Sequence, residues 1–154
     1  MNRHLRFLKN TLDTLSDEVV VISQRGDIVY ANQAWVDFGN DNGCQINDWQ
    51  GLNYLAACER AEADGNHPAR CARQAIQAVL SDEDVAAYME YPCHAPDSCR
   101  RYRMVVTGFE SGGTRYGVVL HRYVSDEDLA DDDVAWELER PLAPRFADLE
   151  PRAI

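Results

Sequence analysis

The segment "EYPCHAPDSCRRYRM" (Glu90–Met104) places three side chains capable of metal or redox chemistry, Cys93, His94 and Cys99, within seven positions. Structural zinc usually has four ligands in short paired spacings such as C-x2-C, which this chain lacks. Neighbouring residues of a strand point to opposite faces, so Cys93 and His94 do not easily share one ion. If the segment is a hairpin, Cys93 and Cys99 flank its loop and could lie opposite each other. We therefore expect that the two thiols simply pack in a polar hairpin turn and that no metal is bound. A Cys93–Cys99 redox pair and a metal site are the alternatives that stay open.

Catalytic signatures are weak throughout the chain. A thiol nucleophile needs a base close in space, not next to it along a strand. The serines lie in no G-x-S-x-G turn, and no phosphate-binding glycine loop is present. The acidic runs Asp82–Asp84 and Asp126–Asp133 are typical of solvated surface rather than of a calcium loop. We predict that the protein is not an enzyme.

Charge is distributed unevenly along the 154 residues, whose formal net charge is −11. Residues 126–154 contain ten acidic residues and three arginines, which leaves a net charge of −4 for the rest. Hydrophobic residues make up 45% of the chain, as in an ordinary globular protein. An acidic chain without a basic stripe argues against nucleic acid or an anionic membrane as a partner.

The amino-terminal residues give no targeting signal. "MNRHLRFLKNTLDTLSDE" lacks an apolar signal-peptide core and a small-residue cleavage site. No apolar run approaches the roughly 18 residues that a membrane-spanning helix needs. We therefore predict a cytoplasmic protein. Its five cysteines are expected to be free thiols in that reducing compartment.

The first fifteen residues predict an amphipathic helix. Leucines recur at spacings of three and four along one face, whereas Arg3, Arg6 and Lys9 fall on other faces. Such a narrow stripe needs a surface to cover, because a helix of some thirteen residues is marginal in isolation. The stripe consists of Leu5, Leu8, Leu12 and Leu15.

The middle of the chain alternates between strand and helix signals. "EVVVISQRGDIVYAN" has two β-branched runs around Arg25-Gly26-Asp27 and predicts a tight hairpin. Asn32 is expected to cap a short helix, "QAWVDFGND", and Pro68 to lie in the first turn of another, "PARCARQAIQAVLSD". "GLNYLAACERAEA" predicts one or two helical turns between them.

Three extended segments, 86–93, 99–109 and 114–124, close the domain. The last two are joined by Glu110-Ser111-Gly112-Gly113, which predicts a hairpin. An order of helix, two strands, short helices and three strands excludes a purely parallel sheet. We predict an α+β fold: a five-stranded antiparallel sheet with short helices on one face, plus the amino-terminal amphipathic helix.

This order and several particular stretches resemble the PAS sensory domain. "GDIVYANQAWVDF" looks like its second strand and the helix that follows, and "GLNYLAAC" like the entry to its later helices. "RYRMVVTGF" and "YGVVLHRYVSDED" resemble its last two strands, and "EYPCHAPDSCRRYRM" is similar to a hairpin in a subgroup of bacterial PAS domains. The resemblance covers about residues 13–125. We therefore divide the chain into an amino-terminal helix (1–15), a PAS-like sensor domain (16–125) and an acidic tail or linker (126–154).

The resemblance implies a module of signal transduction that binds a small ligand or a protein partner and relays its state by dimerisation or docking. A ligand-free dimerisation or docking module and a thiol redox sensor using Cys93 and Cys99 are the alternatives. Flavin is not expected, because Tyr54 stands where the light-sensing branch has its reactive cysteine. Haem is not expected either, because the nearest histidine is His67, beside a loop and a proline. The effector is expected to be a separate signalling protein or a domain outside this chain.

Two groups of residues are candidates for the sensor's surfaces. The space between sheet and helices is expected to be filled by side chains that either bind a ligand or simply pack: Trp35, Phe38, Tyr54, Leu55, Ile76, Tyr102, Met104 and Val118. In "YGVVLHRY", Tyr116, Val118 and Leu120 alternate with Gly117, Val119 and His121. We assign the first row to the core and the second to the outer face of the sheet. A homodimer is expected to form through Leu5, Leu8, Leu12 and Val119.

Overall fold

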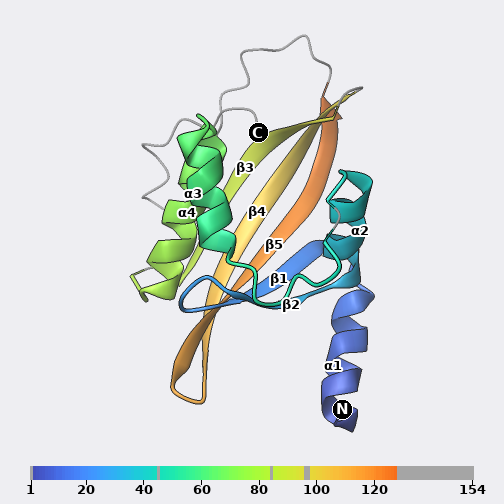
Figure 1. The fold of residues 1–154 in the computed structure, drawn as a ribbon, viewed down its shortest axis with the longest axis vertical. Coiled ribbons are helices and arrows are strands. Elements are labelled where there is room, and N and C mark those ends of the chain that lie inside the picture. The colour runs from blue at the N-terminus through green and yellow to red at the C-terminus, as the bar shows by residue number, and fades with distance from the viewer. Residues whose placement is uncertain (1, 45, 84, 96–97, 128–154) are drawn as a thin grey trace.

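A computed structural model describes residues 2–44, 46–83, 85–95 and 98–127, with only the backbone described for 93–95, 98–99 and 125–127. It confirms the predicted α+β architecture, with the amino-terminal helix present (Figure 1). The predicted tail lies outside the described residues apart from its first two positions. The elements are α1 (Arg3–Asp13), β1 (Glu18–Ser23), β2 (Ile28–Ala31), α2 (Gln33–Asp41), α3 (Tyr54–Ala63), α4 (His67–Leu80), β3 (Ala86–Ala95), β4 (Ser98–Ser111) and β5 (Thr114–Glu127).

The sheet is antiparallel throughout, in the order β2-β1-β5-β4-β3. The first strand, β1, therefore pairs with the last, β5, so the sheet is complete only when both ends of the domain are in place. β4 and β5 are joined by Gly112 and Gly113, whose φ angles of 58° and 75° suit a tight turn that favours glycine. Figure 1 shows these two strands as a long curved hairpin in the middle of the sheet.

Asparagine begins each of the three helices that cover the sheet. The side chains of Asn32, Asn53 and Asn66 each accept a hydrogen bond from the backbone N–H three residues later, at 2.8–3.0 Å. This satisfies one of the free donors of a helix's first turn. Pro68 lies in the first turn of α4, where it costs no backbone hydrogen bond. The predicted roles of Asn32 and Pro68 are confirmed.

The core lies between the sheet and α4, and two strand glycines mark where they come closest. Gly108 and Gly117 are cross-strand partners on the face beneath α4. A Cβ atom on Gly117 would lie 3.3 Å from Leu80 and 3.2 Å from Ile22, and one on Gly108 would lie 3.1 Å from Val79. The close approach of the helix thus favours glycine at both positions, because a larger side chain would require its neighbours to shift.

The two faces of β5 are opposite to those predicted. Val119 is fully buried in the core, so the prediction that it forms an apolar spot on the outer face is wrong. Gly117 and His121 are buried on the same side. Val118 and Leu120, which alternate with them, lie on the open face and are partly exposed. Both rows are apolar, so alternation by itself could not distinguish the faces.

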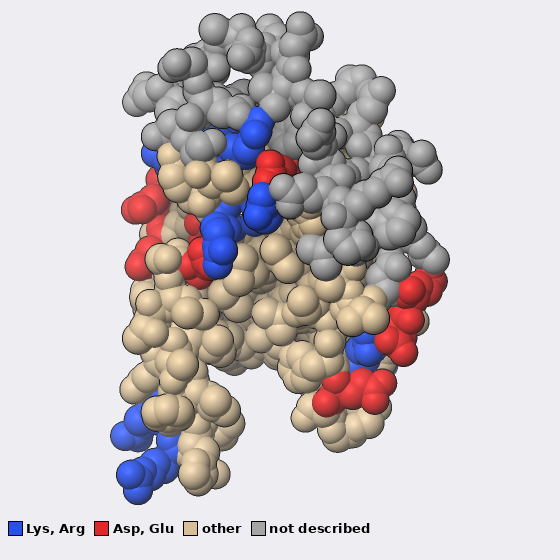
Figure 2. Space-filling model, turned by 180° about the vertical axis from the view of Figure 1, so that it is seen from behind, with Lys and Arg blue, Asp and Glu red and all other residues tan. Residues whose placement is uncertain are grey.

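The open face of the sheet is uncharged in its middle and charged toward one end. Figure 2 shows uncharged side chains across the middle of the molecule's back and a group of basic and acidic side chains above them. Arg103 bonds Glu90 at 3.0 Å, and Arg122 bonds Asp17 at 3.0 Å.

Helix α1 stands apart from this sheet (Figure 1). None of its residues is buried, and the side chains of Leu5 and Leu8 are 59% and 56% exposed. The helix is therefore not folded onto its own sheet, and its leucine stripe is partly buried only at Leu12. In the same part of the chain, none of the helices combines the length and apolarity needed to cross a bilayer.

The assignment of faces can be tested with two neighbouring valines of equal size. Val119→Ala should lower the free energy of unfolding by about 2 kcal/mol, because it leaves a cavity in a fully buried site. Val118→Ala should cost less than about 1 kcal/mol, because that side chain is partly exposed. Urea denaturation measures both, and a larger loss for Val118 would contradict the assignment.

Candidate functional site

A buried histidine on β5 joins two tyrosines from different elements. His121 is 8% exposed, and its Nε2 lies 2.9 Å from the hydroxyl of Tyr54 at the start of α3. Its Nδ1 lies 2.6 Å from the hydroxyl of Tyr91 on β3. Helix, central strand and edge strand thus meet at one imidazole.

Burial keeps this imidazole neutral. Desolvation lowers the pKa of His121 to about 4, so at neutral pH one ring nitrogen donates a hydrogen bond and the other accepts one. The pKa of Tyr54 is raised, by burial first and then by the nearby Cys58 and Glu18. Tyr54 therefore stays protonated, and it forms with the neutral imidazole and the Tyr91 hydroxyl a hydrogen-bonding chain inside an apolar core.

Aromatic rings surround this chain. The ring of Trp35 lies 5.7 Å from that of His121 and 5.8 Å from that of Tyr54, between centroids. Trp49, from the segment before α3, meets Trp35 edge to face at 5.7 Å. Its ring also occupies the place where a Cβ on Gly39 would be, 2.6 Å away. The missing side chain of Gly39 therefore lets Trp49 pack against α2.

Both indoles have an unused donor. The Nε1 atoms of Trp35 and Trp49 are buried and make no hydrogen bond among the described residues. A buried donor without a partner costs about 1–3 kcal/mol, so most proteins keep few of them. Here two lie in adjacent rings beside the histidine chain.

Glu18 adds a titratable group at the same end of the core. It is the cross-strand partner of His121 in the β1–β5 ladder. Partial burial, together with the charge of Asp17, raises the pKa of Glu18 to about 7. Its protonation therefore changes near neutral pH, beside Tyr54 and His121.

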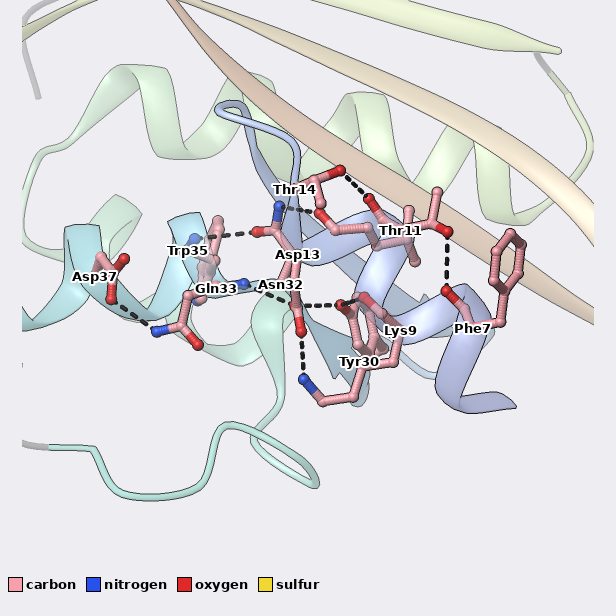
Figure 3. Close-up of polar contacts among 11 residues, drawn as sticks. Phe7, Lys9, Thr11, Asp13, Thr14, Tyr30, Asn32, Gln33, Trp35 and Asp37 are labelled. Atoms are coloured by element: carbon pink, nitrogen blue, oxygen red, sulfur yellow. Dashed lines mark hydrogen bonds and ion pairs between the residues drawn. The ribbon is translucent and has the colours of Figure 1, made fainter. Parts of the chain in front are cut away.

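Asn32 connects this region to the amino-terminal helix (Figure 3). Its side-chain oxygen accepts from the N–H groups of Val19 and Trp35, at 2.9 and 3.0 Å. Its side-chain amide donates to the carbonyl oxygens of Leu12 and Asp17, at 3.1 and 2.9 Å. One fully buried amide therefore holds the start of α2, the start of β1 and the end of α1.

Asp13 makes a second connection at the end of α1. Its Oδ1 accepts from the Tyr30 hydroxyl at 2.7 Å and from the Gln33 N–H at 3.0 Å. Its other oxygen pairs with Lys9 one turn earlier. Figure 3 shows these contacts beside those of Asn32, so the last turn of α1 is tied to both β2 and α2.

Most of the predicted pocket residues do come together. They belong to the core or pack against it, whereas Val118 lies on the open face. Whether they contact a ligand stays a prediction. The seven are Trp35, Phe38, Tyr54, Leu55, Ile76, Tyr102 and Met104.

Sequence reasoning missed four members of the site: Glu18, Trp49, Tyr91 and His121. His121 was assigned to the outer face through the error on β5. The sequence feature that could have placed His121 in the core is Gly117. It pairs with Gly108 across the β4–β5 hairpin, and two such strand glycines indicate the face that a helix approaches. Trp49 had no periodic signal, because it lies between helices.

The segment containing Cys93 and Cys99 adopts the predicted hairpin. The register pairs Cys93 with Arg100 and His94 with Cys99, so the two cysteines are not cross-strand partners as proposed. Their side chains lie outside what is described, and their redox role stays a prediction. Among the described residues, no three His, Cys, Asp or Glu side chains group closely enough to hold a metal.

Comparison with known proteins identifies the fold. No family model matches the chain. The PAS domain of BvgS from Bordetella pertussis superposes with a TM-score of 0.58 at 14% identity, over 80% of this chain and 88% of that one. The chain adopts the PAS fold. VqmA bound to DPO also matches this PAS architecture, with a TM-score of 0.55 at 16% identity, over 79% of this chain and 57% of that one.

A relative at higher identity is much longer than this PAS unit. An uncharacterized 104.1 kDa protein in the hypE 3′ region of Rhodobacter capsulatus is 34% identical over 122 residues. The match covers 77% of this chain and 12% of that protein. The superposition on the PAS domain of BvgS confirms the predicted PAS resemblance as a fold.

The buried histidine should give stability a characteristic pH dependence. Between pH 6.5 and about 4 the unfolded chain binds a proton at His121 that the folded protein does not, so acidification over this range lowers the free energy of unfolding. His121→Gln should flatten this fall, as measured by urea denaturation at successive pH values.

Glu18 should have the opposite effect on stability. It holds its proton in the folded state between pH 4.5 and about 7, so wild-type stability falls as pH rises through that range. Glu18→Gln should remove this fall in the same measurement.

The exposed His67 provides a matched control. His67→Gln should leave the profile as in the wild type. An equal flattening in His67→Gln and His121→Gln would contradict a special role for the buried imidazole.

Proposed function

We propose that the protein is a signal-sensing module that binds a small molecule between the sheet and helices α2–α4 and relays the bound state through α1. The observation that supports this most is the position of Asn32. It caps the helix that contains Trp35, a wall of the candidate site, and it also bonds Leu12 in α1. A ligand that shifts Trp35 would thus change the geometry at the end of α1.

The polar chain in the core favours ligand binding over simple packing. An all-apolar core would avoid the cost of burying His121 and of leaving two indole donors without partners. VqmA, which has the same fold, is bound to DPO. By analogy, we propose that the space between the sheet and the helices accepts a small molecule here.

We propose that this ligand is neither haem nor flavin. His67 is exposed at the start of α4, and both ring nitrogens of His121 are bonded to tyrosines, so neither suits an iron ligand. Tyr54, where the light-sensing branch has cysteine, is itself bonded to His121. These residues do not fit the chemistry of either group.

The output of the module is proposed to act on a separate signalling protein or effector domain. The R. capsulatus relative, of which this chain matches 12%, supports this proposal, because a segment similar to this chain lies within a longer protein there. A catalytic role is not proposed, because His121 is neutral at neutral pH and both its ring nitrogens are engaged by tyrosine hydroxyls.

Native mass spectrometry of the freshly purified full chain tests ligand binding. We expect a discrete added mass that disappears on denaturation, and Trp35→Ala should lose it while Tyr116→Ala, on the open face, keeps it. A bare mass, together with no rise in Tm on adding a small-molecule extract of the source cells, would support the ligand-free docking module instead. A loss of about two daltons on mild oxidation, mapped to Cys93 and Cys99, would favour the thiol sensor.

We also propose a homodimer formed through the exposed leucine stripe of α1. Two such helices would bury the apolar side chains that one protomer leaves in water, in the manner of a short coiled coil. Because Val119 is buried in the core, the interface rests on Leu5, Leu8 and Leu12 alone.

Light scattering should therefore give twice 17.4 kDa for the wild type and a monomer for the double variant Leu5→Asp, Leu8→Asp. Phe7→Asp is a matched control, because Phe7 is 70% exposed and lies about 200° around the helix from Leu5. It should remain dimeric. A monomeric wild type at tens of micromolar, or equal effects of Phe7→Asp and the double variant, would refute this interface.

A further inference from the structure

We infer that the ligand of this core site is an uncharged small molecule with a hydrogen-bond acceptor, such as a carbonyl oxygen, and that Trp35 and Trp49 donate their indole N–H groups to it. The inference rests on the proposed ligand-binding function. It adds the chemical class of the ligand and the two residues that recognise it.

The first support is the pairing of unused donors. In the described part of the chain, the buried side-chain nitrogen and oxygen atoms without a hydrogen-bond partner are the Nε1 atoms of Trp35 and Trp49. Their rings are in edge-to-face contact at 5.7 Å. In such a contact only one indole can direct an N–H at the face of the other, so at least one donor still needs an acceptor.

The second support is that neighbouring polar groups are already bonded. Both nitrogens of His121 have tyrosine hydroxyls as partners. The amide of Asn32 makes two bonds through its oxygen and two through its nitrogen. Around Trp35, the two indole N–H groups are therefore the donors that remain available to a ligand.

Charge excludes an anion as the preferred ligand. Among the described residues, the buried polar or charged ones are Asn32 and His121, and no lysine or arginine is buried. His121 is neutral because its burial lowers its pKa to about 4. A carboxylate or phosphate would lose its hydration without gaining a counter-charge, and it would approach Glu18.

A cation is the stronger competitor, since aromatic faces and the carboxyl of Glu18 both attract positive charge. The unused N–H groups oppose it, however, because the edge of an aromatic ring and its N–H carry partial positive charge. A cation would leave both indole donors without acceptors. A neutral acceptor satisfies them.

The test uses four probes of similar size that differ in charge and hydrogen bonding: acetophenone, ethylbenzene, benzoate and benzylamine. Each is titrated into the full ¹⁵N-labelled chain, and the indole N–H signals are followed by NMR. The chain has three tryptophans, so Trp35→Phe, Trp49→Phe and Trp136→Phe assign the signals while keeping a ring at each position.

We expect acetophenone to move the Trp35 and Trp49 indole protons downfield and to bind about tenfold more tightly than ethylbenzene, which has the same shape without an acceptor. Trp35→Phe and Trp49→Phe should each reduce this preference. Leu120→Ala, on the open face, should leave it unchanged and serves as the matched control.

The outcomes separate this inference from the proposed function. Equal affinities for acetophenone and ethylbenzene, or tighter binding of benzoate or benzylamine, would overturn the inference while leaving a ligand site in the core. Binding of acetophenone without movement of either indole signal would overturn it in the same way. If none of the four probes perturbs any signal from the core, the proposed ligand site and this inference fail together.

Discussion

The buried amide of Asn32 is the constraint on which the arrangement of this protein depends. Its four side-chain hydrogen bonds join segments that are up to twenty residues apart in sequence. A buried amide is costly unless all its groups are bonded, and here the full set exists only when α1, β1 and α2 are in place together. The side chain therefore stabilises the one arrangement in which all three elements are in place, and it destabilises partial arrangements, which leave some of its groups without a hydrogen bond.

A second polar group, Tyr54–His121–Tyr91, lies beside the ring of Trp35 from α2. It joins α3, β5 and β3, so α3 is held against the sheet by a directional bond as well as by apolar contact. Together the two groups flank Trp35, with Asn32 at its backbone and His121 at its ring. A change in the position of Trp35 would therefore be felt by both networks, which is the physical basis of the proposed sensing.

Helix α1 differs from the rest of the fold in how it is held. Its last turn is fixed by Asn32 and Asp13, whereas Leu5 and Leu8 in its first turns are more than half exposed. An element fixed at one end and apolar along one side can transmit a small rotation to a second molecule. This combination links the core site to the proposed interface without requiring movement of the sheet.

The sequence by itself determined the elements and the cap of one helix. Gln33–Asp41 has the predicted bounds, Asn32 and Pro68 have their predicted roles, and the glycine pair turns the β4–β5 hairpin. These features depend on residues close in the chain. The stripe of Leu5, Leu8 and Leu12 could likewise be predicted, because helical periodicity depends only on residues close in the chain.

Only the tertiary structure decided which face of β5 is buried and which side chains meet in the core. Val118 and Val119 are equally apolar, so alternation could not separate them, and the close approach of α4 over Gly117 made the choice. Tyr54, Tyr91 and His121 are 30 to 67 residues apart and have no shared pattern. Their meeting depends on the strand order β1-β5-β4-β3, which brings distant segments side by side because a sheet pairs strands by surface and register, not by sequence distance.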